Sequence, residues 1–300
     1  MSPKEKDVAK CLESLFKRLD AAKLAPETIL KSAAQKEHYE SILMFAFRKL
    51  QAARYHYQQV EGLLDAQRRE LGRLHSKSKP SGDKFKIVSS TMRISKSANE
   101  FTFELSAFFA AIRSAIDFLA RVCAQHFKGV QADSITTLLG LIKNGKTGPI
   151  LDTIAEDTEW LTRLRDYRDY LVHRLVISTT SGGEVQWKDG SAITTPYPIV
   201  VPSETPKHFP DTRRARAFDE PENRLSVMTS EASVTYSDGR KRLIKKCVQM
   251  EPTGGYIRIE DLMKREINAF ERFFVRVVEA LTKLDFALAP LKVSTPKKPL

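Results

Sequence analysis

Cysteine is scarce in this chain, and the cysteines present stand far apart. Cys11, Cys123 and Cys247 have neither the even count of a disulfide framework nor the close spacing of a metal-binding pair. We therefore expect a cytoplasmic protein. No cluster of His, Asp and Glu has metal-ligand spacing, so we predict no bound metal or other cofactor. These histidines have no partner at ligand spacing and are expected at the surface or its boundary: His38, His56, His75 and His126.

Long apolar runs are absent as well. No window approaches the roughly 18 uninterrupted apolar residues of a membrane-spanning helix, so we expect no membrane partner. The first 20 residues alternate charged and apolar side chains and lack the apolar block of a secretory signal. Apolar residues nevertheless make up 42% of the chain, which is enough for a sizeable core.

Positive charge, by contrast, is abundant. The net charge is +12, which favours a polyanionic partner. Residues 72–98, which include Lys84 and Lys86, hold seven Lys or Arg against one acid, a net +6. This segment is either a solvated loop or a patch that contacts phosphates. A second basic run begins Arg240-Lys241-Arg242 and has the same two interpretations.

Apolar residues recur at alternating steps of four and three, which is the spacing of helices with a narrow apolar seam. Long helices are predicted over 39–74, over 99–127, from Pro149 to about Leu175, and from Ile259 to Leu284. The composition between the last two helices favours short strands around turns, with Ser237-Asp238-Gly239 as the best hairpin signal.

The predicted fold is mainly α, an up-and-down four-helix bundle with a β-rich insertion before the last helix. The chain divides into an N-terminal helical segment (1–32), the bundle (33–176 and 259–289), the insertion (177–258) and a flexible tail (290–300).

The stretch 140-GLIKNGKT-147 matches the phosphate-binding loop of nucleotide hydrolases. Such a loop needs a buried strand before it and a helix after it. Here the preceding residues favour a short helix over 133–142, capped by Asp133 or Ser134. We therefore predict that this helix ends at Asn144-Gly145 with a left-handed glycine, and that Pro149 opens the next helix. A nucleotide hydrolase is the lesser alternative.

The helix opened by Pro149 carries an arginine at a position of its apolar seam. Leu161, Leu164 and Leu171 define the seam, and residue 168 is Arg. A guanidinium there needs an acidic partner, water or an anion-binding cleft. His173 follows five residues later, about 140° around the helix and roughly 7 Å along it. The two side chains can therefore share a site if a second copy of the helix packs against the first.

The stretch 168-RDYLVH-173 resembles the signature of the HEPN superfamily, an Arg, four to six residues and then a His, late in a bundle helix. The stretch 109-FAAIRSAIDFLAR-121 is similar to the neighbouring helix of these proteins, with Asp117 as its inward acid. The resemblance covers the four helices and leaves the β-rich insertion unexplained.

The resemblance implies a homodimer and a metal-independent endoribonuclease, in a family whose members often serve as toxins or defence effectors, with an antitoxin or partner protein. His173 and its symmetry mate would act as base and acid, and Arg168 would hold the phosphate. Asp169 or Asp117 would orient them. Further candidates for RNA contact are Arg174, Arg113, Lys84, Lys86, Arg240, Lys241 and Arg242.

A non-catalytic interaction module is the alternative function. In that case the bundle dimerises and the insertion grips a partner protein or nucleic acid, and Arg168 pairs with a carboxylate inside the bundle. A module of this kind would keep every activity in His173→Ala and lose binding when 176–258 is deleted.

Overall fold

The structure is a computed structural model of the chain. It describes residues 3–77, 87–93, 98–173, 182–188, 191–196, 198–204, 227–235, 241–250 and 255–291. Side chains are described over 7–73, 100–169, 171, 198–204 and 255–291.

The described chain is mainly helical. Its helices are α1 (Pro3–Asp20), α2 (Ala33–Lys77), α3 (Ala98–Ala124), α4 (Ile135–Lys143), α5 (Pro149–Ala155), α6 (Thr158–His173) and α7 (Ile259–Thr282). Its strands are β1 (Ile87–Arg93), β2 (Gly182–Lys188), β3 (Ser191–Pro196), β4 (Val200–Pro202), β5 (Val227–Thr235), β6 (Lys241–Met250) and β7 (Tyr256–Arg258).

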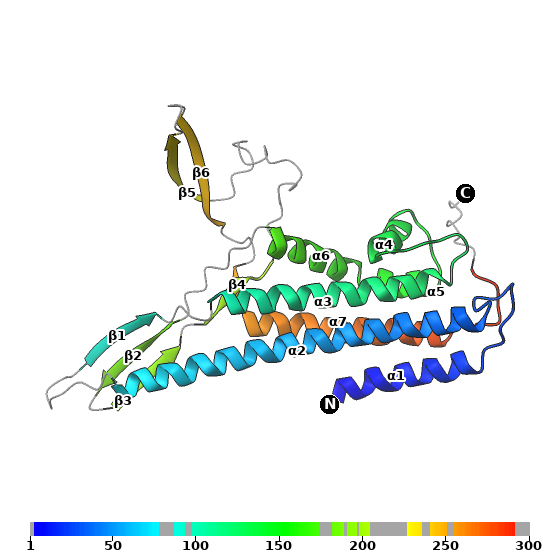
Figure 1. Cartoon of the computed structure of the whole chain (residues 1–300), viewed down its shortest axis with the longest axis horizontal. Helices are drawn as coiled ribbons and strands as arrows, with labels where there is room; N and C mark the ends of the chain where they lie inside the picture. Colours follow the sequence, from blue (N-terminus) through cyan, green and yellow to red (C-terminus); the bar gives the residue numbers. More distant parts are fainter. Residues whose placement is uncertain are drawn as a thin grey trace.

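The long helices lie side by side along the longest axis of the molecule (Figure 1). Helix α2 packs along α3, and α7 contacts both of them as well as α1 and α5. Helix α6 packs on α3 and runs back along it in the opposite direction. Helix α7 thus packs against four other helices, which explains why its buried residues extend beyond a single seam.

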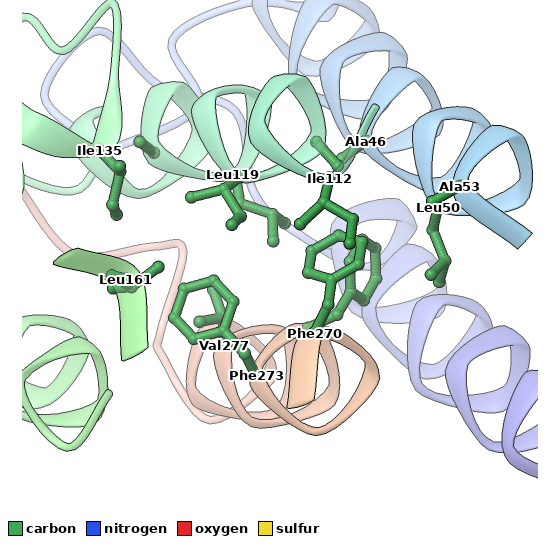
Figure 2. Close-up of a cluster of buried hydrophobic side chains, with 14 of the residues drawn as sticks. Ala46, Leu50, Ala53, Ile112, Leu119, Ile135, Leu161, Phe270, Phe273 and Val277 are labelled. Atoms are coloured by element: carbon green, nitrogen blue, oxygen red, sulfur yellow. The ribbon is translucent and has the colours of Figure 1, made fainter. Parts of the chain in front are cut away.

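Apolar side chains from widely separated parts of the sequence meet in this core. Figure 2 shows part of it, with Ala46, Leu50 and Ala53 of α2, Ile112 and Leu119 of α3, Ile135 of α4, Leu161 of α6, and Phe270, Phe273 and Val277 of α7. All of them are buried. Burial of such surface is the main favourable term in folding, so this cluster fixes how the helices pack.

The seams predicted for α2 and α7 are confirmed over most of their length. The seam residues of α2 are buried from Tyr39 to Leu64, apart from Tyr57, and those of α7 are buried from Met263 to Leu281. Gln67, the polar residue in the predicted seam of α2, is buried too. Helix α3 ends at Ala124, three residues before the predicted end.

One predicted helix is wrong. The segment opened by Pro149 forms two helices, α5 and α6, separated at Glu156 and Asp157. Both carboxylates bind Arg276 of α7, with 2.6 Å between Arg276 Nη1 and Glu156 Oε2. Asp157 directly precedes α6, where Asp is a favoured N-cap residue. The long-range ion pairs, together with this cap position, account for the break.

In the part of the chain that the structure describes, the strands form three small antiparallel sheets. Strand β1 pairs with β2, and β2 with β3, beside α2. The sequence pattern did not predict strand β1. This strand joins the segment between α2 and α3 to the insertion. Strands β5 and β6 flank residues 236–240, in agreement with the predicted hairpin, although that turn lies outside the described residues.

The chain after α7 returns to the end of α3. Leu291, in the predicted tail, donates its backbone N–H to the carbonyl of His126 at 2.7 Å and accepts one from Lys128 at 2.9 Å. Residues 292–300 of that predicted tail lie outside the described residues.

Candidate functional site

Helix α6 carries the predicted catalytic pair, and its buried face fixes how it is presented. The buried positions are Trp160, Leu161, Leu164, Tyr167 and Leu171. The sequence pattern placed Arg168 in this seam, and that expectation is wrong, because Tyr167 occupies the buried position. The reason is that Trp160 and Tyr167, two aromatic residues outside the predicted stripe, are buried as well, which turns the buried face of α6 away from position 168.

Arg168 lies instead at the edge of the buried face, where its side chain is 39% exposed. Its Nη1 donates to Oδ1 of Asp169 at 2.9 Å, and Asp169 is 44% exposed. Arg168 Nε is shielded from solvent and has no hydrogen-bond partner among the residues that the structure describes. The guanidinium is therefore held by its sequence neighbour, and its side chain stays partly exposed.

His173 is the last residue of α6. Its side chain lies outside the described side chains, so its distance to Arg168 stays a prediction from helix geometry. The backbone thus places both members of the predicted pair in the final turns of one helix, on different faces of it.

Asp117 is already occupied by structural contacts. Its carboxylate accepts the backbone N–H of Ile135 at 3.0 Å and the Nε–H of Arg113 at 3.2 Å. Ser134 stands at the N-cap of α4, but its hydroxyl makes no capping hydrogen bond within the described residues. Ser134 is therefore the N-cap residue, as predicted, but the side-chain acceptor for the first N–H of α4 comes from Asp117.

Asp117 also lies away from Arg168 along the helix axis. Phe109 of α3 stacks on Tyr167 of α6, with ring centroids 4.9 Å apart. Asp117 follows Phe109 by eight residues, which is about 12 Å of helix. The expectation that Asp117 orients the catalytic pair therefore has no support in this geometry, whereas Asp169 does contact Arg168.

The structure describes only some of the residues that are predicted to contact RNA. Arg113 is partly buried, and its guanidinium binds both Asp117 and Thr136 Oγ1. Lys241 and Arg242 lie in β6, where only the backbone is described. Residues 84, 86, 174 and 240 fall outside the described residues. The structure thus brings together Arg168 with Asp169, and Arg113 with Asp117.

A polar cluster lies on the buried side of α6, and the sequence pattern did not predict it. Glu266 of α7 is buried, and its carboxylate accepts the indole N–H of Trp160 at 2.8 Å and the Nε–H of Arg265 at 2.8 Å. The hydroxyl of Tyr167 donates to the carbonyl of Pro202 at 2.7 Å. The aromatic residue just before Arg168 was the sequence signal that could have led to this cluster.

The stretch 140–147 forms no phosphate-binding loop. Residues Ile135–Lys143 are helical, and Gly145 adopts φ +70° after them. The N–H of Gly145 binds the carbonyl of Ile142 at 2.9 Å, and that of Lys146 binds Leu141 at 3.0 Å. This is the Schellman ending of a helix. The prediction of a glycine cap is confirmed, and Pro149 at the start of α5 confirms the next helix.

Within the described residues, no group of three or more His, Cys, Asp and Glu could hold a metal ion. No helix in the described part is long and apolar enough to cross a bilayer. No protein-family model, curated protein or solved structure matches the chain.

Proposed function

We propose that this chain is a metal-independent endoribonuclease of the HEPN type, in which Arg168 and His173 act across a homodimer cleft. In this proposal α2, α3, α6 and α7 correspond to the four helices of the HEPN bundle, and the biological role is that of a toxin or defence effector. The observation that carries the proposal is the Arg168 guanidinium, half-exposed in the final turns of α6 and hydrogen-bonded to Asp169.

The chemistry follows from the residue types. A base removes the proton of the 2′-OH, the 2′-oxygen attacks phosphorus, and an acid protonates the departing 5′-oxygen. His173 serves as the base, and His173 of the partner subunit serves as the acid. Arg168 stabilises the charge that develops on the phosphorane, and Asp169 keeps the guanidinium in place.

The proposed mechanism needs two copies of the chain, because Arg168 and His173 lie on different faces of one straight helix. Arg168 and His173 lie about 140° apart around α6 and roughly 7 Å apart along it. A single substrate phosphate is therefore reached best when α6 of a second copy faces the first. The net charge of +12 would draw the RNA backbone to such a cleft.

A non-catalytic interaction module is the second candidate. The observation in its favour is that strands β5 and β6 stand away from the helices (Figure 1). Phe103 of α3 is also 67% exposed, as an aromatic anchor for a partner would be. In this case replacing residues 205–254 with a short linker abolishes partner binding, whereas His173→Ala does not.

Cleavage of a defined RNA tests the first proposal. We expect the wild-type protein to cut RNA in the presence of EDTA and to leave a DNA of the same sequence intact, since DNA lacks the attacking hydroxyl. His173→Ala should abolish cutting, and His38→Ala, at an exposed histidine of α2, should leave it unchanged.

Two results would contradict the ribonuclease. One is intact RNA after incubation with the wild-type protein, and the other is a His173→Ala variant that cuts at the wild-type rate. RNA binding without cleavage, lost with 205–254 and unaffected by His173→Ala, would select the interaction module.

A further inference from the structure

The buried side of helix α6 is hydrogen-bonded to β4, a strand of the β-rich insertion. Tyr167 is only 2% exposed, its ring stacks on Phe109, and its hydroxyl binds the carbonyl of Pro202. Pro202 ends β4 and is itself buried. The residue directly before Arg168 therefore has a fixed position and a fixed rotation about the helix axis.

The strand that Tyr167 binds is in turn fastened to α7. Strand β4 pairs with β7, with Val201 opposite Ile257. Strand β7 runs directly into α7, and the N–H of Ile259 donates to the carbonyl of Ile199 at 2.9 Å. The pair of strands, which we call the stem, is therefore joined directly to the start of α7.

A second polar contact ties the same three elements together. Arg265 of α7 donates to Glu266 and to the carbonyl of Ser203, at 2.8 and 3.3 Å. Glu266 also accepts the indole N–H of Trp160 in α6. Both ends of the buried face of α6 are thus bonded to α7 or to the stem.

We propose that Tyr167 is a positioning residue for Arg168, and that its hydrogen bond to the stem sets the direction in which the guanidinium points. The proposal rests on the proposed ribonuclease. Successive residues of a helix are about 100° apart, so fixing Tyr167 in the core fixes Arg168 at the edge of the buried face. A displacement of about 1 Å in a catalytic group can lower a rate by about a hundredfold.

The variant Tyr167→Phe removes the hydroxyl and keeps the ring. It leaves the Pro202 carbonyl without this donor, so we expect α6 to shift relative to the stem. The kcat for RNA cleavage should fall by at least about tenfold. KM should change by less than about threefold, because charge attracts the RNA backbone whatever the exact direction of Arg168.

Tyr39→Phe is the matched control. Tyr39 is fully buried, and its hydroxyl lies 2.7 Å from Nε2 of His126, a contact as short as that of Tyr167 but at the far end of α3. Both variants should lower the melting temperature to a similar degree. Only Tyr167→Phe should lower kcat, and only this variant should speed amide hydrogen exchange in residues 164–171.

The outcomes separate the two proposals. If the wild-type protein leaves RNA intact, the ribonuclease is wrong and the positioning role falls with it. If the wild-type protein cuts RNA and Tyr167→Phe cuts it with the same kcat, only the positioning role is overturned. Equal losses of kcat in Tyr167→Phe and Tyr39→Phe would also overturn it, because stability alone would then explain the effect.

Discussion

The Arg113–Asp117 pair of α3 and the Arg168–Asp169 pair of α6 are alike in chemistry and differ in what else they bind. Arg113 and Asp117 are 16% and 26% exposed, and both also bind α4. Arg168 and Asp169 are 39% and 44% exposed, and the contact that the structure shows for Arg168 is with its neighbour. The first pair holds two helices together, whereas the second stays partly exposed, as the proposed binding of a phosphate requires.

The largest effect should come from Arg168→Ala. We expect RNA cleavage to slow by about a hundredfold or more, because a preorganised donor at a developing charge is worth that much. The free energy of unfolding should change by less than about 1 kcal/mol, since exposed ion pairs contribute little. Single-turnover cleavage and urea denaturation measure the two quantities.

Arg165 provides the matched control for this variant. It is 40% exposed and donates to its own neighbour, Asp166, at 2.8 and 2.9 Å. Arg165→Ala removes the same charge from the same helix, so we expect less than about a threefold change in cleavage. If both variants slow cleavage equally, the effect comes from net charge and Arg168 has no special place.

The next effect concerns stability, on the buried side of α6. Glu266→Ala removes the acceptor of Trp160 and of Arg265. We expect a loss of about 3 kcal/mol of unfolding free energy, because the buried indole N–H of Trp160 loses its acceptor and Arg265 loses its carboxylate partner. Glu266→Gln keeps an acceptor for the indole and should lose about half as much. A loss below about 1 kcal/mol in Glu266→Ala would show that the cluster does not anchor α6.

The sequence predicts those features that depend on short-range pattern. The alternating seam identified α2, α3 and α7, because a helix shows its buried face at a fixed period. The left-handed glycine at position 145 was predictable for a similar reason, since the ends of helices have local signals.

Features that depend on distant partners could not be predicted in this way. The break between α5 and α6 is held by Arg276, 120 residues beyond Glu156. Asp117 caps a helix that begins 18 residues later. Tyr167, and not Arg168, is buried in α6 because its ring stacks on Phe109 and its hydroxyl binds the carbonyl of Pro202, both far away in the sequence. The choice of Arg168, Asp169 and His173 rests on residue type and resemblance, which the packing neither requires nor forbids.

Acid should destabilise the protein through a histidine remote from α6. His126 was expected at the surface or its boundary, but it is fully buried, and burial lowers its pKa to about 3 from an ordinary value of 6.5. Between these two values the unfolded state binds more protons than the folded state, so stability is complete above pH 6.5 and falls as the pH drops towards 3. Between pH 7 and pH 5 the loss from this group is about 2 kcal/mol.

Urea denaturation at pH 7 and at pH 5 measures this loss. His126→Gln should remove most of the difference between the two pH values, because the variant has no imidazole to protonate. His38→Ala, at an exposed histidine of α2, should keep the full difference. An unchanged difference in His126→Gln would mean that another group controls the acid sensitivity.

The smallest effect tests whether the role of Asp117 is to hold α4 and Arg113 in place, with no part in catalysis. Asp117→Ala removes the cap of α4 and the partner of Arg113, and we expect it to cost about 1 to 2 kcal/mol of unfolding free energy. Asp117→Asn keeps a side-chain oxygen, and Asn caps helices about as well as Asp, so its cost should be below about 0.5 kcal/mol. Neither variant should slow RNA cleavage once the protein is folded. If Asp117→Asn stops cleavage at wild-type stability, the carboxylate belongs with Arg168, and the contrast between the two pairs is wrong.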